Sequence, residues 1–485
     1  LKKAVYDSTD PKLTPVFQEL SVAEGTGRLI VMQVYPGLPP YTDTSGKGTI
    51  RIGKDCQPLT GTMRRKIMIE TGETDFTGTE IPEPLESLIS PSAMEKLREA
   101  AAREKAPDDL LRQTDWDLLG AVGLIRHSRL LRAGLFLAGT NEAIRQYFPG
   151  YVWTHLRMSS DTNYTDRADG YEAIPVALER ILDRIMADNP ITTLKQGLFH
   201  FEIRTYPEIA LREALLNALV HSDYRIPGPI LVKQFKGRLE VSNPGGLPGG
   251  ITPENILRHE PVPRNPALVD ALTRLRLVNR SNLGVRRMYQ ALLMEGKEPP
   301  TIMDEGNAVR VIFRATPLSP SIRTFVAEES DRGRLLPLEH LLIIQHLLRH
   351  PELDTATAVR ITQQSENDAR EMLSRMESEL GYLERGGTGR GTYWILRRDL
   401  HRRFSASEHL ERNLRIDWEA AKTRVLSVLI ERQKRGEAGL SNEEIRQITH
   451  FDRNQSRRLI LELIDENKKI KQVGKRRWAR YEYFL

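Results

Sequence analysis

The 485-residue chain contains one cysteine, Cys56, and it lacks any apolar run of eighteen residues or more. A single cysteine excludes an internal disulfide and favours a reducing compartment such as the cytoplasm. The missing apolar run predicts no membrane-spanning helix and no membrane partner. The chain also has no G-x-x-x-x-G-K-[ST] string, which argues against a P-loop helicase. Because the first residue is Leu1 rather than Met, we expect the natural N-terminus to lie upstream.

Length and composition predict several globular domains. A chain of 485 residues is too long for one hydrophobic core, so three or more domains are expected. The hydrophobic content of 39% and charged content of 28% are typical of globular proteins. The net charge of +6 is modest, but basic residues are concentrated in the last stretch of the chain.

The segment 212–224, which reads REALLNALVHSDY, carries the strongest chemical signal. Glu213 and Asn217 are four residues apart in a helical pattern, so both lie on one helix face. A carboxylate can hold or deprotonate a water molecule, and an amide oxygen is a ligand that suits Mg²⁺. Taken alone, Glu213 is also explained as a solvated helix charge. His221 on the same face could contact phosphate or serve a structural role, and Asp223 could simply end the helix.

Two glycine-containing segments follow this helix. Residues 238–242 alternate like a strand and run into the turn NPGGLPGG at 243–250. Residues 279–284 then precede a helical pattern at 285–293, and such a loop offers backbone N–H groups to phosphates. Either glycine turn alone would be only a turn, but the order of the three segments predicts a nucleotide site.

This order resembles the GHKL ATPases, in particular the divergent ATPase-like domain of RecG-like and Schlafen-type bacterial regulators. Four ordered strings carry the resemblance over about residues 200–316: REALLNALVHSDY, LEVSNPGGLPGGI, VPRNPAL and LGVRRMYQALLMEG. The resemblance implies ATP and Mg²⁺ as cofactors, Glu213 as general base and Asn217 as the metal ligand. It also implies a nucleotide-binding set formed by Asn217, Asn243, Gly245, Gly246, Asn282, Gly284 and Arg286.

Two positions depart from that family pattern. Asn243 stands where an adenine-reading Asp is usual, although an amide oxygen can also accept a hydrogen bond from the adenine amino group. Asn282 stands where a glycine is usual, and Asn tolerates left-handed backbone geometry. ATP binding with slow or absent hydrolysis is therefore expected, and a DNA-binding scaffold with a degenerate nucleotide site is an alternative.

Residues 1–80 are predicted to be rich in β-structure. Strands are expected at 27–35 and 49–53, separated by the loop at 36–40. This arrangement resembles the second half of the AlbA-like domain of Schlafen proteins, which implies binding to DNA or RNA. A Schlafen-like nuclease is the rival interpretation, but residues 1–80 lack a convincing cluster of acidic metal ligands.

The remaining segments are a helical connector at 81–199, a linker at 317–335 and two winged-helix modules at 336–404 and 405–485. In the second module, a recognition helix and a wing would contact DNA. The residues expected to do so are Arg453, Gln455, Arg457 and Arg458 on the helix and Lys475, Arg476 and Arg477 on the wing. A solvated basic face is the alternative there. The acidic recognition helix of the first module favours packing or dimerisation.

The sequence thus predicts an α+β multidomain protein. It combines part of an AlbA-like β-rich domain, a GHKL-like α/β sandwich and two winged-helix modules. We expect an ATP-binding, DNA-binding regulator that acts in transcription or phage defence. By resemblance, nucleotide binding promotes assembly into a homo-oligomer, a dimer or larger.

Overall fold

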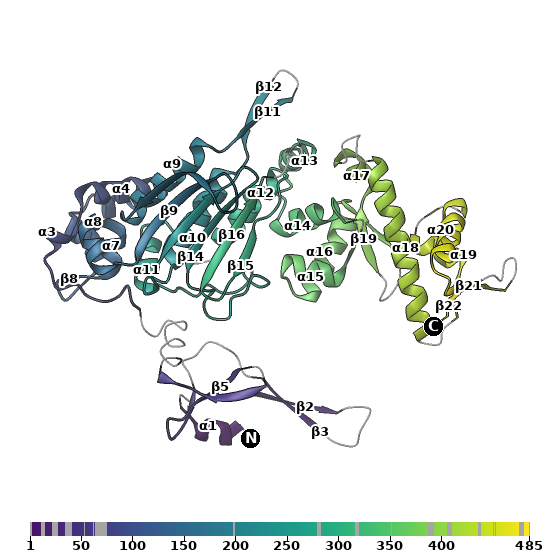
Figure 1. The fold of residues 1–485 in the computed structure, drawn as a ribbon, viewed down its shortest axis with the longest axis horizontal. Helices are drawn as coiled ribbons and strands as arrows, with labels where there is room; N and C mark the ends of the chain where they lie inside the picture. The colour runs from purple at the N-terminus through teal and green to yellow at the C-terminus, as the bar shows by residue number, and fades with distance from the viewer. Residues whose placement is uncertain are drawn as a thin grey trace. The chain divides into compact units, whose positions relative to one another are not determined.

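The computed structural model divides into two compact units, which we describe separately (Figure 1). Unit 1 comprises residues 1–292 and 298–316, and unit 2 comprises residues 293–297 and 317–485. The description covers residues 2–484 except 11–14, 22–27, 34–40, 53, 62, 64–74, 197–198, 279–282, 316–319, 351, 387–391, 405–409, 435–437, 450, 452 and 475–479. Across the described residues, no helix combines the length and the apolar character that crossing a bilayer requires.

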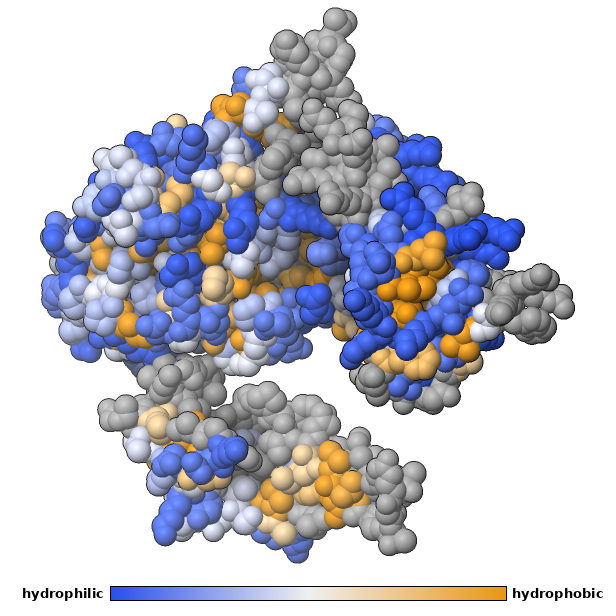
Figure 2. Space-filling model, turned by 45° about the vertical axis from the view of Figure 1, so that its right-hand side comes forward, coloured by the Kyte–Doolittle hydropathy of each residue, from blue (hydrophilic) through white to orange (hydrophobic). Residues whose placement is uncertain are grey.

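The N-terminal part of unit 1 is built mainly from short antiparallel strand pairs. They follow α1 (Lys2–Ser8) and comprise β1 (Thr9–Asp10) with β4 (Thr42–Asp43), β2 (Val16–Ser21) with β3 (Arg28–Gln33), and β5 (Thr49–Ile52) with β6 (Asp55–Pro58). The positions of β3 and β5 agree with the expected strands, while the loop expected at 36–40 lies outside the described residues. Four consecutive apolar side chains of β3, Leu29 to Met32, are between 42% and 56% exposed. Figure 2 shows hydrophobic side chains gathered on the surface of this part.

A layer of short helices follows. It consists of α3 (Leu85–Leu88), α4 (Pro91–Arg103), α5 (Asp108–Leu111), α6 (Asp115–Ala121), α7 (Arg132–Ala138) and α8 (Asn141–Tyr147), with the strand pair β7 (Ile125–Arg126) and β8 (Arg129–Leu130). Ser90, Thr114 and Thr140 begin α4, α6 and α8 with side-chain oxygens that accept from backbone N–H groups. Phe136 of α7 stacks on Tyr224 at 3.8 Å between ring centroids, which anchors this layer beside the segment 212–224.

A six-stranded mixed sheet forms the centre of unit 1. Its strand order is β10-β9-β13-β14-β16-β15. The bounds are β9 Tyr151–Met158, β10 Tyr164–Gly170, β13 Gly228–Gln234, β14 Arg238–Pro244, β15 Thr301–Asp304 and β16 Ala308–Arg314. The pair β9 and β13 is parallel, and every other neighbouring pair in this sheet is antiparallel. The range 81–199, expected as a helical connector, therefore supplies β9 and β10 to the sheet.

Four helices accompany the sheet: α9 (Ile174–Ala187), α10 (Glu208–His221), α11 (Pro266–Arg274) and α12 (Leu283–Met294). Helix α9 packs on β9, α10 packs on β14, and the two helices contact each other. A hairpin of β11 (Ile191–Gln196) and β12 (Phe199–Arg204) connects α9 to α10. Most of α10 is buried, and from Leu211 onward its partly exposed positions are limited to Arg212, Glu213, Asn217 and His221. Three of these four, Glu213, Asn217 and His221, repeat every four residues and form one polar stripe.

Unit 2 contains two modules with the same order of elements. The first has α14 (Leu338–Leu347), β17 (Leu353–Asp354), α15 (Thr355–Thr362), α16 (Glu366–Ser378), β18 (Leu383–Gly386) and β19 (Tyr393–Leu396). The second has α18 (Leu410–Lys434), β20 (Leu440–Ser441), α19 (Asn442–Thr449), α20 (Arg453–Glu466), β21 (Ile470–Val473) and β22 (Arg480–Tyr483). The sheet orders correspond, β17-β19-β18 and β20-β22-β21. A capping box begins α19: Ser441 N donates to Glu444 Oε2 at 2.8 Å, and Glu444 N donates to Ser441 Oγ at 3.2 Å.

Two helices of unit 2 were not expected from the sequence. The segment 317–335, expected as a linker, contains α13 (Pro320–Asp331), and α17 (Arg398–Phe404) follows the first module. Phe325 of α13 is 2% exposed and meets the rings of Tyr382 and Phe404 edge to face. The proline and charge content of the segment suggested a linker, but the apolar face of α13 packs on distant residues and keeps it helical.

Candidate nucleotide site

The candidate site is built on the polar stripe of α10. Glu213 and Asn217 converge on the first turn of α12, where a methyl group added to Gly284 would lie 2.7 Å from Glu213 Oε2 and 3.9 Å from Asn217 Nδ2. Glycine at position 284 thus permits the close approach of α12 to α10, since any larger residue would meet the carboxylate. Helical spacing places the Glu213 and Asn217 side chains on one face of α10. The fold then brings both side chains close to the backbone of Gly284.

The environment of Glu213 changes its acidity. Its side chain is 19% exposed, and its Oε1 lies 3.7 Å from Nη1 of Arg287 on α12. Burial raises the pKa of the Glu213 carboxyl, while the charges of Arg287 and Arg212 oppose this effect. Arg286 was expected in the nucleotide-binding set and stays a prediction, while its neighbour Arg287 is near Glu213. Asn282 lies outside the described residues.

The glycine turn after β14 is held tightly on both sides. Gly245 has a φ of +90°, and a methyl group there would lie 2.9 Å from Cβ of Asp223. A methyl group on Gly246 would lie 2.6 Å from the carbonyl oxygen of Gly306. Asp304 accepts from the backbone N–H groups of Leu247 at 3.2 Å and Gly306 at 2.8 Å. Both glycines are therefore required by close backbone packing.

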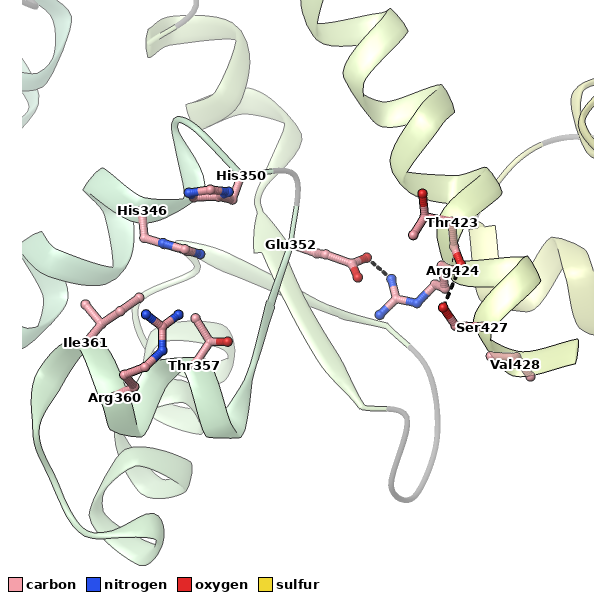
Figure 3. A pocket seen from close by; sticks show the side chains of 10 residues that line it. All are labelled: His346, His350, Glu352, Thr357, Arg360, Ile361, Thr423, Arg424, Ser427 and Val428. Atoms are coloured by element: carbon pink, nitrogen blue, oxygen red, sulfur yellow. Dashed lines mark hydrogen bonds and ion pairs between the residues drawn. The ribbon is translucent and has the colours of Figure 1, made fainter. Parts of the chain in front are cut away.

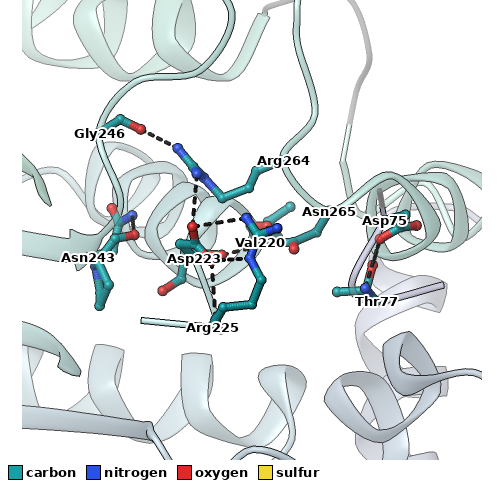
Figure 4. Close-up of polar contacts among 11 residues, drawn as sticks. Asp75, Thr77, Val220, Asp223, Arg225, Asn243, Gly246, Arg264 and Asn265 are labelled. Carbon is teal, nitrogen blue, oxygen red and sulfur yellow. Dashed lines mark hydrogen bonds and ion pairs between the residues drawn. The ribbon is translucent and has the colours of Figure 1, made fainter. Parts of the chain in front are cut away.

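A buried polar cluster connects this turn to the end of α10 (Figure 4). Nη1 of Arg264 lies 3.3 Å from Oδ2 of Asp223, and Nη2 of Arg264 donates to the carbonyl of Gly246. Nδ2 of Asn265 donates to the carbonyl oxygens of Val220 at 2.8 Å and Ser222 at 2.9 Å. Burial alone would raise the pKa of Asp223, but hydrogen bonds from Arg225 and the charges of Arg225 and Arg264 hold it below its usual range.

From the sequence, Asp223 was expected only to end the helix, and Arg264 and Asn265 had no individual role. The string VPRNPAL was the available signal, because it places an arginine and an asparagine next to each other directly before α11. The start of α11 is itself fixed by Asp75, whose Oδ2 accepts from the N–H of Ala267 at 2.7 Å. These residues hold the glycine turn and α10 in place.

Two further predicted positions have defined surroundings. Asn243 is 7% exposed, and its Nδ2 donates to the carbonyl of Pro244 at 3.2 Å, while its Oδ1 accepts no hydrogen bond from the described residues. Burial, together with the charge of Arg264, lowers the pKa of His221 to about 4, so its imidazole is neutral at pH 7. His221 can therefore offer a hydrogen bond but no positive charge.

The residues present fit a magnesium nucleotide. Among the described residues, no group of three or more His, Cys, Asp or Glu side chains could hold a metal ion by itself. Mg²⁺ in nucleotide sites takes one or two protein oxygens and completes its shell with phosphates and water. The side-chain oxygen of Asn217 with the neighbouring Glu213 matches that pattern, and the free Oδ1 of Asn243 matches an adenine amino group.

The residues predicted to contact DNA lie on α20. Arg453, Gln455 and Arg457 are exposed, and neither Arg453 nor Arg457 has a hydrogen bond or ion pair with any described residue. Arg458 differs, since its Nε lies 2.9 Å from Glu462 Oε1 and its guanidinium is 5.2 Å from the ring centre of Trp418. The predicted wing residues Lys475, Arg476 and Arg477 lie outside the described residues.

Comparison with known proteins supports an ATPase-related domain. The family described as "Putative ATP-dependent DNA helicase recG C-terminal" matches residues 228–313, from β13 to β16. The crystal structure of the DIP2311 protein from Corynebacterium diphtheriae superposes with a TM-score of 0.64 at 20% sequence identity, over 99% of this chain and 82% of that chain. None of the curated proteins matches this chain. The central part of unit 1 is thus a GHKL-like, ATPase-related domain within a mixed α/β multidomain fold.

Proposed function

We propose that this protein binds Mg·ATP between α10, α12 and the glycine turn after β14, and that it is a DNA-binding regulator. The observation that supports this most directly is the convergence of Glu213 and Asn217 on Gly284. The glycine leaves the backbone N–H groups at the start of α12 accessible to an anion beside a carboxylate and an amide. The match of residues 228–313 to an ATPase-related family covers the glycine turn and α12 of this site, while α10 lies before the matched range.

Each residue of the site has a proposed role. Asn217 holds the magnesium ion through its side-chain oxygen, and Oδ1 of Asn243 accepts a hydrogen bond from the adenine amino group. Glu213 orients a water molecule and accepts its proton, because a carboxylate with a raised pKa is a stronger base than an exposed one. When bound, Mg·ATP supplies the phosphoanhydride bond that would be cleaved, and its metal ion neutralises negative charge on the phosphate groups. Arg287 competes for the Glu213 carboxylate, which is consistent with slow turnover.

DNA binding is proposed for the second module of unit 2. Its helices and three-stranded sheet have the element order of a winged helix, and α20 is in the position of the recognition helix. Arg453 and Arg457 are separated by one helical turn, exposed and free of ion pairs with described residues. Unpaired arginines on one helix face are suited to phosphate and guanine contacts. A role in transcription control or phage defence extends this proposal, as does assembly into a homo-oligomer.

Calorimetric titration of the chain with ATP and Mg²⁺ tests the nucleotide site. We expect saturable binding by the unmodified protein and none by Asn217→Ala, because the variant loses the proposed metal ligand. Arg314→Ala, an exposed substitution on β16, is the matched control and should bind normally. If the unmodified protein binds no ATP at millimolar concentration, the domain is a scaffold that has lost its nucleotide.

A further inference from the structure

A pocket in unit 2 is independent of the nucleotide site. It is lined by residues of α14, α15 and α18, so it lies where the first module meets the long helix of the second (Figure 3). Its volume is about 810 Å³, which is within the range of small-molecule and cofactor sites. The GHKL-like domain contributes nothing to its lining.

The charged side chains of the pocket are predominantly cationic. Four lining residues can carry positive charge: His346, His350, Arg360 and Arg424. Glu352 is the single carboxylate among the lining residues, and it is already ion-paired with Arg424. Because Glu352 is paired with Arg424, Arg360 is left as an uncompensated positive charge, and no unpaired carboxylate of the lining would repel an anionic occupant.

Several of these cationic groups have no hydrogen-bond partner. His346, in the last turn of α14, and His350, three residues beyond its end, stack with 4.2 Å between ring centroids. Among the described residues, neither imidazole forms a hydrogen bond, and Arg360 forms neither a hydrogen bond nor an ion pair. In Figure 3 the Arg360 side chain extends toward His346. Two imidazoles and a guanidinium thus line the same pocket, and their N–H groups donate to no described residue.

We propose that this pocket binds a phosphate group, carried either by a small phosphorylated molecule or by a nucleic-acid backbone. A guanidinium fork matches phosphate oxygens in geometry, and imidazole N–H groups add donors without the bulk of a lysine. Thr357 supplies a further hydroxyl to the lining. The occupant would use donors of Arg360 and the imidazoles that no described residue satisfies.

The occupant would also connect the two modules. Arg424 of α18 crosses to the first module, where it pairs with Glu352 and lies 3.3 Å from the ring centre of Tyr393. The hydroxyl of Tyr393 in turn donates to the carbonyl of Ile448 on α19 at 2.7 Å. Because Arg424 lines the pocket and holds this junction, phosphate bound there would contact both modules and fix their relative orientation.

Phosphate binding should depend on pH. Burial and the charges of His350 and Arg360 lower the pKa of His346 to about 4, while Asp354 opposes them weakly. Burial lowers the pKa of Arg424 to about 10. A bound anion would favour the protonated imidazole, and by linkage it would bind more tightly as pH falls.

The test uses the full chain with ¹³C-labelled histidine rings, whose NMR signals are assigned with His346→Gln and His350→Gln. Inorganic phosphate without magnesium should shift both ring signals saturably. Arg360→Gln should weaken this binding about tenfold, the usual loss for one charge-assisted hydrogen bond. Arg370→Gln, an exposed and ion-paired arginine of the same module, should bind as the unmodified protein does. Sulfate, whose charge is constant from about pH 8 to about pH 4, should bind more tightly as pH falls toward the pKa of about 4 of His346 in the free protein.

A short DNA duplex distinguishes the two sources of phosphate. If the duplex shifts the same signals at lower concentration than phosphate, and Arg360→Gln reduces the salt slope of duplex binding by about one, the occupant is a nucleic-acid backbone. If phosphate alone shifts them, the occupant is a small phosphorylated molecule. The proposal is overturned if neither ligand shifts the rings, or if Arg360→Gln leaves both affinities unchanged. Arg287→Gln alters only the proposed nucleotide site, so this variant should bind phosphate in the pocket as the unmodified protein does. Loss of ATP binding and loss of phosphate binding can therefore be told apart.

Discussion

Arg264 and Asp223 form an ion pair that is almost sealed from solvent, with Nη1 3.3 Å from Oδ2 and side-chain exposures of 4% and 9%. The pair connects the segment just after α10 to the segment just before α11, and the Arg264 guanidinium also donates to the carbonyl of Gly246. A buried pair of this kind adds little net stability, but loss of one partner leaves an uncompensated charge. Its effect is to fix the glycine turn beside α10.

Arg264→Ala should therefore destabilise unit 1 by about 3 kcal/mol, as expected when one partner of a buried pair is removed. Asp223 would keep Arg225 as a partner, which limits the loss. Chemical denaturation followed by circular dichroism measures the free energy of unfolding. The control Arg314→Ala should alter that free energy by less than about 0.5 kcal/mol. Equal stability of the two variants would mean that the pair does not support the turn.

Glu213→Gln should preserve ATP binding and lower turnover by roughly 10²- to 10⁴-fold, because the amide cannot accept a proton from water. The variant should also be slightly more stable at pH 7. Burial raises the pKa of Glu213, so its ionised form opposes folding at pH values above that pKa. Single-turnover ATP hydrolysis and thermal melts measure the two effects, and unchanged turnover would remove Glu213 from the mechanism.

Gly284→Ala should lower turnover by about tenfold or more, because the new methyl group displaces the Glu213 carboxylate from its position. Stability should fall by no more than about 1 kcal/mol, since the atom displaced is the far end of a flexible side chain and alanine favours the helix. Gly237→Ala is the control, because a methyl group there meets no atom within 4 Å. If both variants hydrolyse ATP equally, Gly284 does not limit the site.

The double substitution Arg453→Gln with Arg457→Gln should reduce the salt slope of DNA binding by about two, one for each lost phosphate contact. Arg370→Gln with Arg375→Gln removes the same charge from α16, where both arginines are ion-paired, and should leave the slope unchanged. Fluorescence anisotropy of labelled DNA at several salt concentrations measures this salt slope. An unaltered slope in the first variant would exclude α20 from the DNA interface.

The free energy of unfolding should decrease as pH falls from about 6.5 toward about 4. Burial, with a contribution from Arg264, lowers the pKa of His221 to about 4, so in that window the unfolded chain binds a proton that the folded chain does not. The pKa of His155 is also lowered by burial, and its Nε2 lies 3.0 Å from Gln234 Oε1. Denaturation midpoints at several pH values should show a weaker dependence in His221→Gln, and an identical dependence would contradict this origin.

Local pattern was sufficient to predict much of the candidate site. The four-residue spacing of Glu213 and Asn217 determines that both share a helix face, whatever that helix packs against. The glycines at 245 and 246 likewise predict a turn, because their effect on the backbone is local. The capping box of Ser441 and Glu444 is local in the same sense, because its two hydrogen bonds join residues three positions apart.

Tertiary structure decided which distant segments meet. Spacing along the chain could not show that Gly284 lies against Glu213, that Arg287 pairs with that carboxylate, or that Arg264 pairs with Asp223. It also could not place β9 and β10 in the central sheet or keep α13 helical in a segment that reads as a linker. Helices and turns depend on residues a few positions apart, so their patterns can be read from the sequence. Sheet order and buried ion pairs depend on the packing of the whole core. That packing lowers the free energy of the protein only when segments far apart in the sequence come together.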